Sequence, residues 1–372
     1  MIYLDNAATT KPFQSVISCM ATTMQENFGN PSSLHRLGVS AANILQDSRK
    51  IISDKANVSP ESIIFTSGAT EANQTVLKCG VHKPNKRRNH ILISSFEHPS
   101  TLSTKSYLED MGYEIEFIVP NNLGIITPKA VAVKMRDTTE LVSIIGVHNE
   151  IGAIQDIKEI KNIIKELNPK TLFHVDGVQW FGKIPLPASN DLPDYFTLSA
   201  HKFHGPRGIG AIIKGPTNSL SPLIDGGGQE NKFRSGTENL PAIVGMAKAI
   251  EEIQDLNTAK IATMQHKLFT AFKNNHDVKW IGPEPGKDRS PFINLIAIKN
   301  KKSEILIHQL EEKDIFVSSG SACSEKSNKR NQNYDFLDLG ESFNDGILRI
   351  SFGYHTTEEE VDQLLQELIN IL

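Results

Sequence analysis

Residues 172–179 read Leu-Phe-His-Val-Asp-Gly-Val-Gln, and residues 195–202 read Tyr-Phe-Thr-Leu-Ser-Ala-His-Lys. Each stretch opens with a short run of β-branched and aromatic residues, which is typical of a strand, and closes on polar side chains. Comparable runs lie at 63–65, 91–93 and 141–147, with helix-like stretches between them. This strand-then-helix order predicts an α/β fold in which helices flank a mostly parallel sheet.

Two stretches have clear helical periodicity. Residues 154–167 carry isoleucines at the spacing of one helix face. The last stretch opens with Thr356 or Thr357, and Glu359 or Glu360 follows three residues later, which is the signature of a capping box. Apolar residues then recur on one face, so we expect a helix through the last turns of the sequence.

A change in the order of the expected helices and strands along the chain suggests two domains. A long helical stretch at 247–267 is followed by strands at 292–298 and 347–352, with helices between them. A chain of 372 residues is also long enough for about two domains at roughly 150 residues each. We expect a large domain of residues 15–256 and a smaller α+β domain made of residues 1–14 and 257–372.

Composition excludes several classes of function. The chain has 39 basic and 43 acidic residues, so its net charge of −4 gives no general attraction to nucleic acid or anionic membrane. No apolar run approaches the ~18 residues of a transmembrane helix. Three cysteines, Cys19, Cys79 and Cys323, are too few and too scattered for a disulfide framework or a zinc site. The first residues lack the features of a secretory signal, so we expect a cytoplasmic protein.

Polar side chains follow each of the five expected strands. Open α/β sheets bind ligands at the carboxyl ends of their strands, so these side chains should meet at one edge. The stretch 66–73 is a small, hydroxyl-rich turn that leads into a helix, and such a turn can cradle a phosphate. The other strands are followed by His98, by Asn149, by Asp176, and by Ser199, His201 and Lys202. Together these groups fit an aromatic heterocycle that carries a phosphate arm and an aldehyde.

Pyridoxal phosphate is such a ligand, and it needs four kinds of group. A lysine amine must bond to its aldehyde, and a carboxylate must keep the ring nitrogen protonated so that the ring can accept electrons. A cup must hold the phosphate, and a flat side chain must cover the ring. In that order, these needs can be met by Lys202, by Asp176, by the turn at 68–70 with Ser199 and His201, and by His98.

The order and spacing of the motifs resemble those of the group I (NifS/IscS-like) cysteine desulfurases. These are pyridoxal-phosphate enzymes of the class V aminotransferase family, with the fold-type I architecture. The resemblance runs from Tyr-Leu-Asp-Asn-Ala-Ala-Thr-Thr at 3–10, through Arg-Ser-Gly-Thr-Glu-Asn at 234–239, to the final helix. Its most telling part is Ser-Ser-Gly-Ser-Ala-Cys-Ser at 318–324, where the family has a nucleophilic cysteine on a mobile loop. Residues 324–333 contain no apolar side chain, so we expect mobility there too.

The resemblance implies a role for each candidate residue. Lys202 bonds to the cofactor aldehyde, Asp176 pairs with the ring nitrogen and Gln179 with the phenolic oxygen, and His98 stacks on the ring and can shuttle protons. Cys323 is the sulfur-accepting nucleophile. The phosphate is held by Ala69, Thr70, Ser199 and His201, joined by Thr237 from a second subunit. The substrate carboxylate binds Arg349 and Asn149, of which Asn149 also contacts the cofactor.

The implied activity is desulfuration of L-cysteine to L-alanine by a homodimer. A persulfide on Cys323 would then serve a sulfur-acceptor protein in iron–sulfur, thiamine or thio-tRNA synthesis, and the sequence leaves that choice open. A selenocysteine lyase or an aminotransferase could use the same scaffold. A cofactor-binding regulator without turnover is a further alternative, against which the joint presence of Lys202, Asp176, Arg349 and Cys323 argues. The spacing of His201 and His204 would also permit a metal, although Lys202 lies between them.

Overall fold

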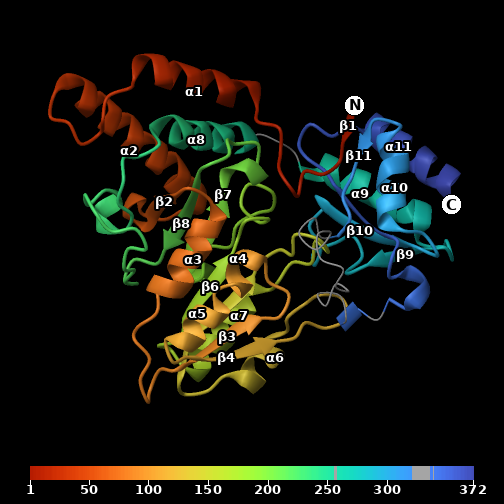
Figure 1. Ribbon diagram of the computed structural model, residues 1–372, viewed down its shortest axis with the longest axis horizontal. Helices are drawn as coiled ribbons and strands as arrows, with labels where there is room; N and C mark the ends of the chain where they lie inside the picture. The colour runs from red at the N-terminus through yellow and green to blue at the C-terminus, as the bar shows by residue number, and fades with distance from the viewer. Residues whose placement is uncertain (255–257, 321–335, 338) are drawn as a thin grey trace.

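The computed structural model describes residues 1–254, 258–320, 336–337 and 339–372 (Figure 1). Its largest element is a seven-stranded sheet in the order β2-β8-β7-β6-β5-β3-β4. All neighbouring strands are parallel except β8, which is antiparallel to both β2 and β7. This confirms the expected α/β fold with a mostly parallel sheet. The strands are β2 (Ile63–Thr66), β3 (His90–Ser94), β4 (Glu114–Ile118), β5 (Thr139–Ile145), β6 (Leu172–Asp176), β7 (Tyr195–Ser199) and β8 (Gly210–Lys214).

Helices cover both faces of this sheet because its buried side chains alternate. In β3, Ile91 and Ile93 pack with apolar residues of α3 and α5, whereas Leu92 joins the cluster that contains α2, α7 and α8. Helix α1 packs on α8. The helices around the sheet are α1 (Gln14–Glu26), α2 (Arg36–Ala56), α3 (Ala69–Cys79), α4 (Pro99–Leu102), α5 (Lys105–Asp110), α6 (Pro128–Lys134), α7 (Ile157–Leu167) and α8 (Leu240–Gln254).

A second set of elements comes from both ends of the chain. Strands β12 (Ile347–Ser351), β10 (Ile293–Ile298) and β9 (Val278–Ile281) form an antiparallel sheet. The first strand, β1 (Ile2–Tyr3), is parallel to β11 (Ile315–Phe316), so the N-terminus lies among the C-terminal elements (Figure 1). The helices here are α9 (Thr258–Phe272), α10 (Ser303–Glu311) and α11 (Glu358–Ile371). From β1 the chain crosses back to α1 and the large sheet.

Three helix predictions can be compared with the structure. Helix α11 starts as expected, because the Thr357 side chain caps it and Glu360 completes the capping box. Helix α7 starts at residue 157 rather than 154, because the Asp156 side chain accepts a hydrogen bond from the Glu159 backbone and ends the preceding loop. The helical stretch expected at 247–267 is divided between α8 and α9, and residues 255–257 lie outside the described part.

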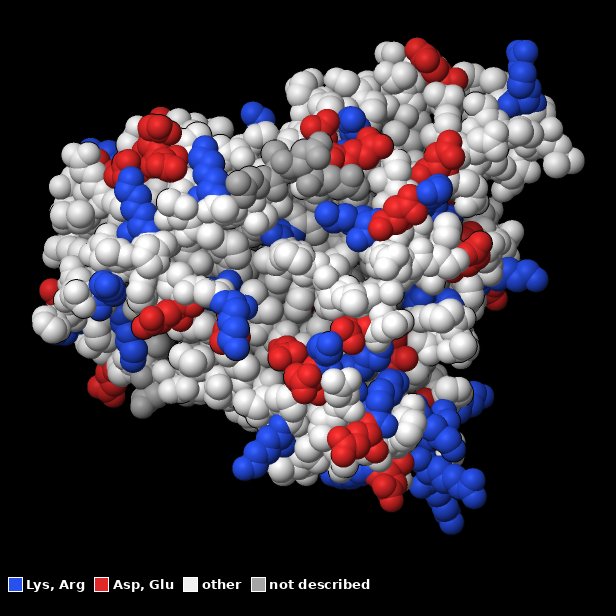
Figure 2. Space-filling model, turned by 180° about the vertical axis from the view of Figure 1, so that it is seen from behind, with Lys and Arg blue, Asp and Glu red and all other residues white. Residues whose placement is uncertain are grey.

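Charged side chains of both signs are spread over the surface. On the face opposite to that of Figure 1, acidic and basic groups lie next to one another rather than gathered by sign (Figure 2). None of the helices in the described ranges is both long and apolar enough to cross a membrane.

Candidate active site

A cavity of about 830 Å³ opens at the carboxyl ends of the large sheet. It is lined by the residues that follow β2, β3, β5, β6 and β7, and three further segments complete it: residues 7–9, Gly320 and Arg349. Thr237 lines a separate cavity of about 140 Å³, and Cys323 lies outside the described residues. The structure thus brings together in one cavity Ala69, Thr70, His98, Asn149, Asp176, Gln179, Ser199, His201, Lys202 and Arg349.

The Asp176 carboxylate is fixed from two sides at the end of β6. Its Oδ1 accepts the backbone N–H of Val178 at 3.0 Å, and its Oδ2 accepts Nδ2 of Asn73 at 2.7 Å. Asn73 is fully buried in α3, and its Oδ1 accepts the Thr197 hydroxyl at 2.5 Å. The amide can therefore present only its donor side to Asp176. Asn73 lies in the stretch 66–73, and no local feature of the sequence indicates this role for it.

His98 is a neutral ring held at the entrance to α4. Its Nδ1 accepts the backbone N–H of Ser100 at 3.1 Å and lies 2.8 Å from Ser100 Oγ. That hydroxyl in turn accepts Nδ2 of Asn73 at 2.9 Å, which links His98 to Asp176 through two side chains. Burial lowers the pKa of His98, with Asp176 opposing and Lys202 reinforcing the shift. The remaining proton of the ring is therefore on Nε2.

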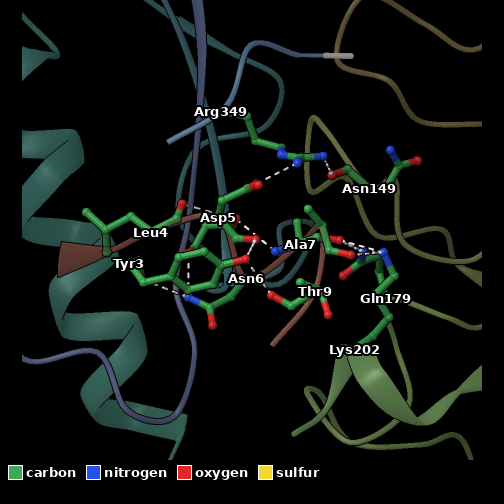
Figure 3. A network of polar contacts seen from close by, with 12 residues as sticks. Tyr3, Leu4, Asp5, Asn6, Ala7, Thr9, Asn149, Gln179, Lys202 and Arg349 are labelled. Atoms are coloured by element: carbon green, nitrogen blue, oxygen red, sulfur yellow. Dashed lines mark hydrogen bonds and ion pairs between the residues drawn. The ribbon is translucent and has the colours of Figure 1, made fainter. Parts of the chain in front are cut away.

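Lys202 ends a short 3₁₀ turn after β7, and its side chain reaches the N-terminal segment (Figure 3). Its Nζ donates to the backbone carbonyls of Ala7 and Ala8, both at 2.8 Å. The Ala7 carbonyl also accepts Nε2 of Gln179 at 2.9 Å. Lys202, which follows β7, and Gln179, which follows β6, thus donate to the same carbonyl, that of Ala7.

The part of the cavity near α3 has the features of an anion cradle. Gly68 has φ +155° and precedes the first helical turn, where Ala69 and Thr70 line the cavity. The first turn of a helix favours negative charge because its N–H groups point outward. Burial, and then the charges of Lys202 and Arg207, lower the pKa of His201 to about 4, so this ring is neutral at pH 7. Arg207 also lines the cavity and was not singled out from the sequence.

Arg349 approaches from the small sheet, on β12. Its Nη2 donates to Asp5 Oδ1 at 2.7 Å, and its Nη1 donates to the backbone carbonyl of Asn149 at 3.2 Å. The side-chain amide of Asn149 points away from Arg349 (Figure 3). Arg349 Nε is buried and has no hydrogen-bond partner among the described residues. The guanidinium lines the cavity, and the N–H groups that Asp5 and Asn149 leave unused could bind an anion.

His204 has a structural explanation in place of a metal. Its Nε2 accepts the backbone N–H of Tyr354 at 3.1 Å, and its Nδ1 donates to the carbonyl of Lys11 at 2.8 Å. Both ring nitrogens are therefore engaged with backbone groups. Within the described ranges, no three His, Cys, Asp or Glu side chains are grouped so that they could hold a metal ion.

Comparison with known proteins identifies the family. Residues 2–364 match the family model of the class-V aminotransferases. The chain is 34% identical to cysteine desulfurase IscS of Methanosarcina thermophila, covering 100% of this chain and 92% of that protein. A solved NifS-like protein superimposes with a TM-score of 0.91 at 32% identity over 100% of both chains. The structure of SspA in complex with cysteine has a TM-score of 0.83 at 30% identity and covers 96% of this chain and 100% of SspA.

The described residues fit pyridoxal phosphate, the cofactor of this family. A lysine amine and a fixed carboxylate face one cavity, and a helix N-terminus with a neighbouring arginine suits the phosphate. The guanidinium of Arg349 lines the same cavity, and its charge suits a carboxylate. This chain therefore belongs to the class-V aminotransferase family and, within it, to the NifS/IscS-type cysteine desulfurases, which are pyridoxal-phosphate enzymes.

Proposed function

We propose that this protein takes the sulfur atom of L-cysteine onto Cys323, releases L-alanine and passes the sulfur to an acceptor protein. The observation that carries the proposal is the convergence of Lys202, Asp176 and Arg349 on one cavity. Cysteine as the substrate is supported by SspA, a structural neighbour solved in complex with cysteine. When bound, pyridoxal phosphate supplies an aldehyde for the amine and a ring that accepts electrons.

Lys202 is the proposed base that moves the α-proton of the substrate. When its amine is not bonded to the cofactor, it could accept that proton. The carbonyls of Ala7 and Ala8 then hold the ammonium, because both already accept hydrogen bonds from Nζ at 2.8 Å. His98 is the proposed cover of the ring, with its Nε2 proton available for transfer.

Arg349 is the proposed anchor of the substrate carboxylate. Its two Nη atoms are already committed to Asp5 and to the Asn149 carbonyl, and these contacts fix the plane of the guanidinium. Each of these contacts uses one N–H, so the guanidinium keeps three further N–H donors, one on each nitrogen. A charge-assisted hydrogen bond in this buried place is strong, which favours amino-acid substrates over amines. We also propose that the side chain of Asn149 contacts the bound cofactor or substrate.

Cys323 is the proposed sulfur acceptor. Its thiolate attacks the substrate sulfur, so an S–S bond forms and the C–S bond breaks. The electron pair of the broken bond ends in a C–H bond of alanine after protonation, which balances the reaction without an outside oxidant. In the sequence Cys323 follows three residues after Gly320, which lines the cavity.

The proposal is tested by incubating the purified protein with pyridoxal phosphate and L-cysteine in the presence of a thiol reductant. Desulfuration yields sulfide and alanine in equal amounts. An aminotransferase would give a keto acid without sulfide, and a regulator without turnover would give neither. The same assay with L-selenocysteine separates a selenocysteine lyase from a desulfurase by the ratio of the two rates.

Asp176→Asn should lower the rate of sulfide release by roughly a hundred-fold or more, because it removes the charge that keeps the ring nitrogen protonated. Asp194→Asn is a matched control: its carboxylate also accepts a backbone N–H, from Phe173, and an asparagine Nδ2, from Asn218. Asp194 does not line the cavity, so this variant should keep the parental rate. Near-parental turnover of Asp176→Asn would show that the pairing with the ring nitrogen is misassigned.

A homodimer is the proposed active form. Two large apolar side chains, Phe28 and Leu34, lie in the segment that joins α1 to α2 and are 71% and 98% exposed. A partner that covers this segment would remove both side chains from water. Thr237 lines a neighbouring cavity that shares Ser67 and Gly208 with the proposed site, and its placement in the phosphate site of a second copy rests on the family resemblance.

Mixing Lys202→Ala with Thr237→Ala should therefore restore activity that neither variant has at low cofactor concentration. A mixed dimer contains one site with both an intact Lys202 and an intact Thr237, so random exchange restores roughly a quarter of the parental sites. The rate of sulfide release is measured before and after subunit exchange. A rate that stays at the sum of the separate variants would place Thr237 in the site of its own chain, and a fully active monomer would exclude the dimer.

The proposed domains are residues 15–256, and residues 1–14 with 257–372. Their support is the sheet membership of the elements: β2 to β8 form one sheet, whereas β1, β11 and the β9–β10–β12 sheet come from the two ends of the chain. We further propose a cytoplasmic location, which agrees with the free thiols of Cys19 and Cys79. The acceptor is a protein of iron–sulfur, thiamine or thio-tRNA synthesis.

A further inference from the structure

Lys183 is a buried lysine one turn beyond Gln179. Lys183 is 4% exposed and Gln179 is 2% exposed. The Nζ atom of Lys183 lies 2.6 Å from Oε1 of Gln179. The turn between them is closed by backbone hydrogen bonds, among them Phe181 N–H to the Gly177 carbonyl and Lys183 N–H to the Trp180 carbonyl. The lysine therefore points back at a residue that lines the proposed active site.

Burying a lysine amine costs free energy of desolvation, and Lys183 also lies near two cations, Lys202 and Arg349. Burial lowers the pKa of Lys183 well below its ordinary value, and the charges of Lys202 and Arg349 lower it further. Lys183 in turn lowers the pKa values of His201 and His204. The ring of Phe292, 5.8 Å from Nζ, offers a cation–π contact. A methionine would fill the same space without desolvating an amine, so packing alone does not account for a lysine here.

The contact with Lys183 decides which way the Gln179 amide faces. Lys183 donates to Oε1 of the amide, so Nε2 faces the opposite way. There Nε2 donates to the Ala7 carbonyl at 2.9 Å. Ala7 is also an acceptor for Lys202, so the donor edge of Gln179 lies beside the amine that bonds to the cofactor (Figure 3). Without Lys183 the amide oxygen loses its donor, and the contact with the Ala7 carbonyl alone holds the amide.

We propose that Lys183 is a positioning residue that holds Gln179 with its N–H edge toward the cofactor and places a basic group behind that amide. This inference rests on the proposed function, in which Gln179 bonds the phenolic oxygen of pyridoxal phosphate. A fixed donor edge favours the anionic form of that oxygen. Loosening it should therefore raise the pKa of the bound cofactor, since an anion that loses a donor holds its proton more tightly.

The experiment compares Lys183→Met, Lys183→Arg and the control Lys214→Met, each loaded with pyridoxal phosphate. Lys214 is also buried, lies 5.5 Å from a phenylalanine ring and donates to two backbone carbonyls, but it does not line the cavity. The absorbance of the bound cofactor is titrated with pH in the absence of substrate. We expect the midpoint of Lys183→Met to rise by roughly one pH unit or more. Lys183→Arg should recover at least half of that shift, and Lys214→Met should titrate like the parent.

Thermal unfolding of the same proteins separates positioning from a structural role. Lys183→Met should unfold no earlier than the parent, because no buried charge is left without a partner. If Lys183→Met does not fold, Lys183→Gln takes its place with the same expected direction. A midpoint equal to that of the parent, or one matched by Lys214→Met, would overturn the inference about Lys183. If the parent binds no pyridoxal phosphate or releases no sulfide, the proposed function itself fails, so the two failures are distinguishable.

Discussion

Lys202→Ala should lower sulfide release by at least about a thousand-fold, because we propose that this one residue supplies both the covalent link to the cofactor and the base. Alanine at this position can do neither. The phosphate cradle and the carboxylate of Asp176 remain in place, so the variant should still bind pyridoxal phosphate. Borohydride treatment of the parent should fix the cofactor on the peptide that contains Lys202, as seen by mass spectrometry. In the variant that label should be absent.

Lys214→Ala is the matched control for this substitution. Lys214 resembles Lys202 in donating to two backbone carbonyls, those of Gly215 and Asn218, at 3.1 and 2.9 Å. It stands at the end of β8, away from the cavity. It should therefore keep parental turnover and parental labelling. A borohydride label on any other lysine, or desulfuration by Lys202→Ala, would remove the basis of the site assignment.

The cavity wall formed by the large sheet could be predicted from local sequence. Each expected strand is followed by its polar residues within a few positions, and parallel strands bring those positions to one edge. The strand ranges expected at 63–65, 91–93, 141–147, 172–175 and 195–198 correspond to β2, β3, β5, β6 and β7. Strands β4 and β8 were not predicted. In β4 glutamates alternate with apolar residues on an edge strand, and β8 begins with a glycine and an alanine.

The opposite wall could not be predicted in the same way, because its contacts join residues far apart in the chain. Arg349 and Asp5 are 344 positions apart, and Lys202 and Ala7 are 195 apart. No periodicity or capping signal records such a contact. The motif at residues 3–10 is part of the family resemblance. That resemblance did not assign a role to Asp5 or to the carbonyls of Ala7 and Ala8.

Residues that support the site from behind were also missed, for a different reason. Lysine and asparagine are mostly exposed in folded proteins, so Lys183 and Asn73 read as surface residues until tertiary packing is known. Both are buried here, and each fixes a side chain that was predicted. Their positions follow from the fold, since Asn73 lies on the face of α3 that meets Asp176. A buried polar residue becomes informative only when its partner is seen.

The two other cysteines, Cys19 and Cys79, lie in surroundings that do not favour a nucleophilic role. Cys19 lies in α1, where its Sγ donates to the Val16 carbonyl at 3.1 Å, and Cys79 ends α3. Burial raises the pKa of both thiols, so their thiolate fraction at neutral pH is below that of a free cysteine. Neither lines the cavity. The proposed acceptor of the sulfur is therefore Cys323 rather than either of these two thiols.

Cys323→Ser should accordingly reduce sulfide and alanine release to the background of the assay. Proton removal from L-cysteine depends on Lys202 and the cofactor, so the variant should still bind the substrate and change the cofactor spectrum. It should then stop, because a serine hydroxyl is almost never ionised at neutral pH and is a poor nucleophile toward sulfur. Cys19→Ser and Cys79→Ser should keep the parental rate. Mass spectrometry after a pulse of L-cysteine should find the added sulfur on the peptide that contains Cys323. Sulfur on Cys19 or Cys79, or normal turnover by Cys323→Ser, would mean that desulfuration here proceeds without the proposed nucleophile.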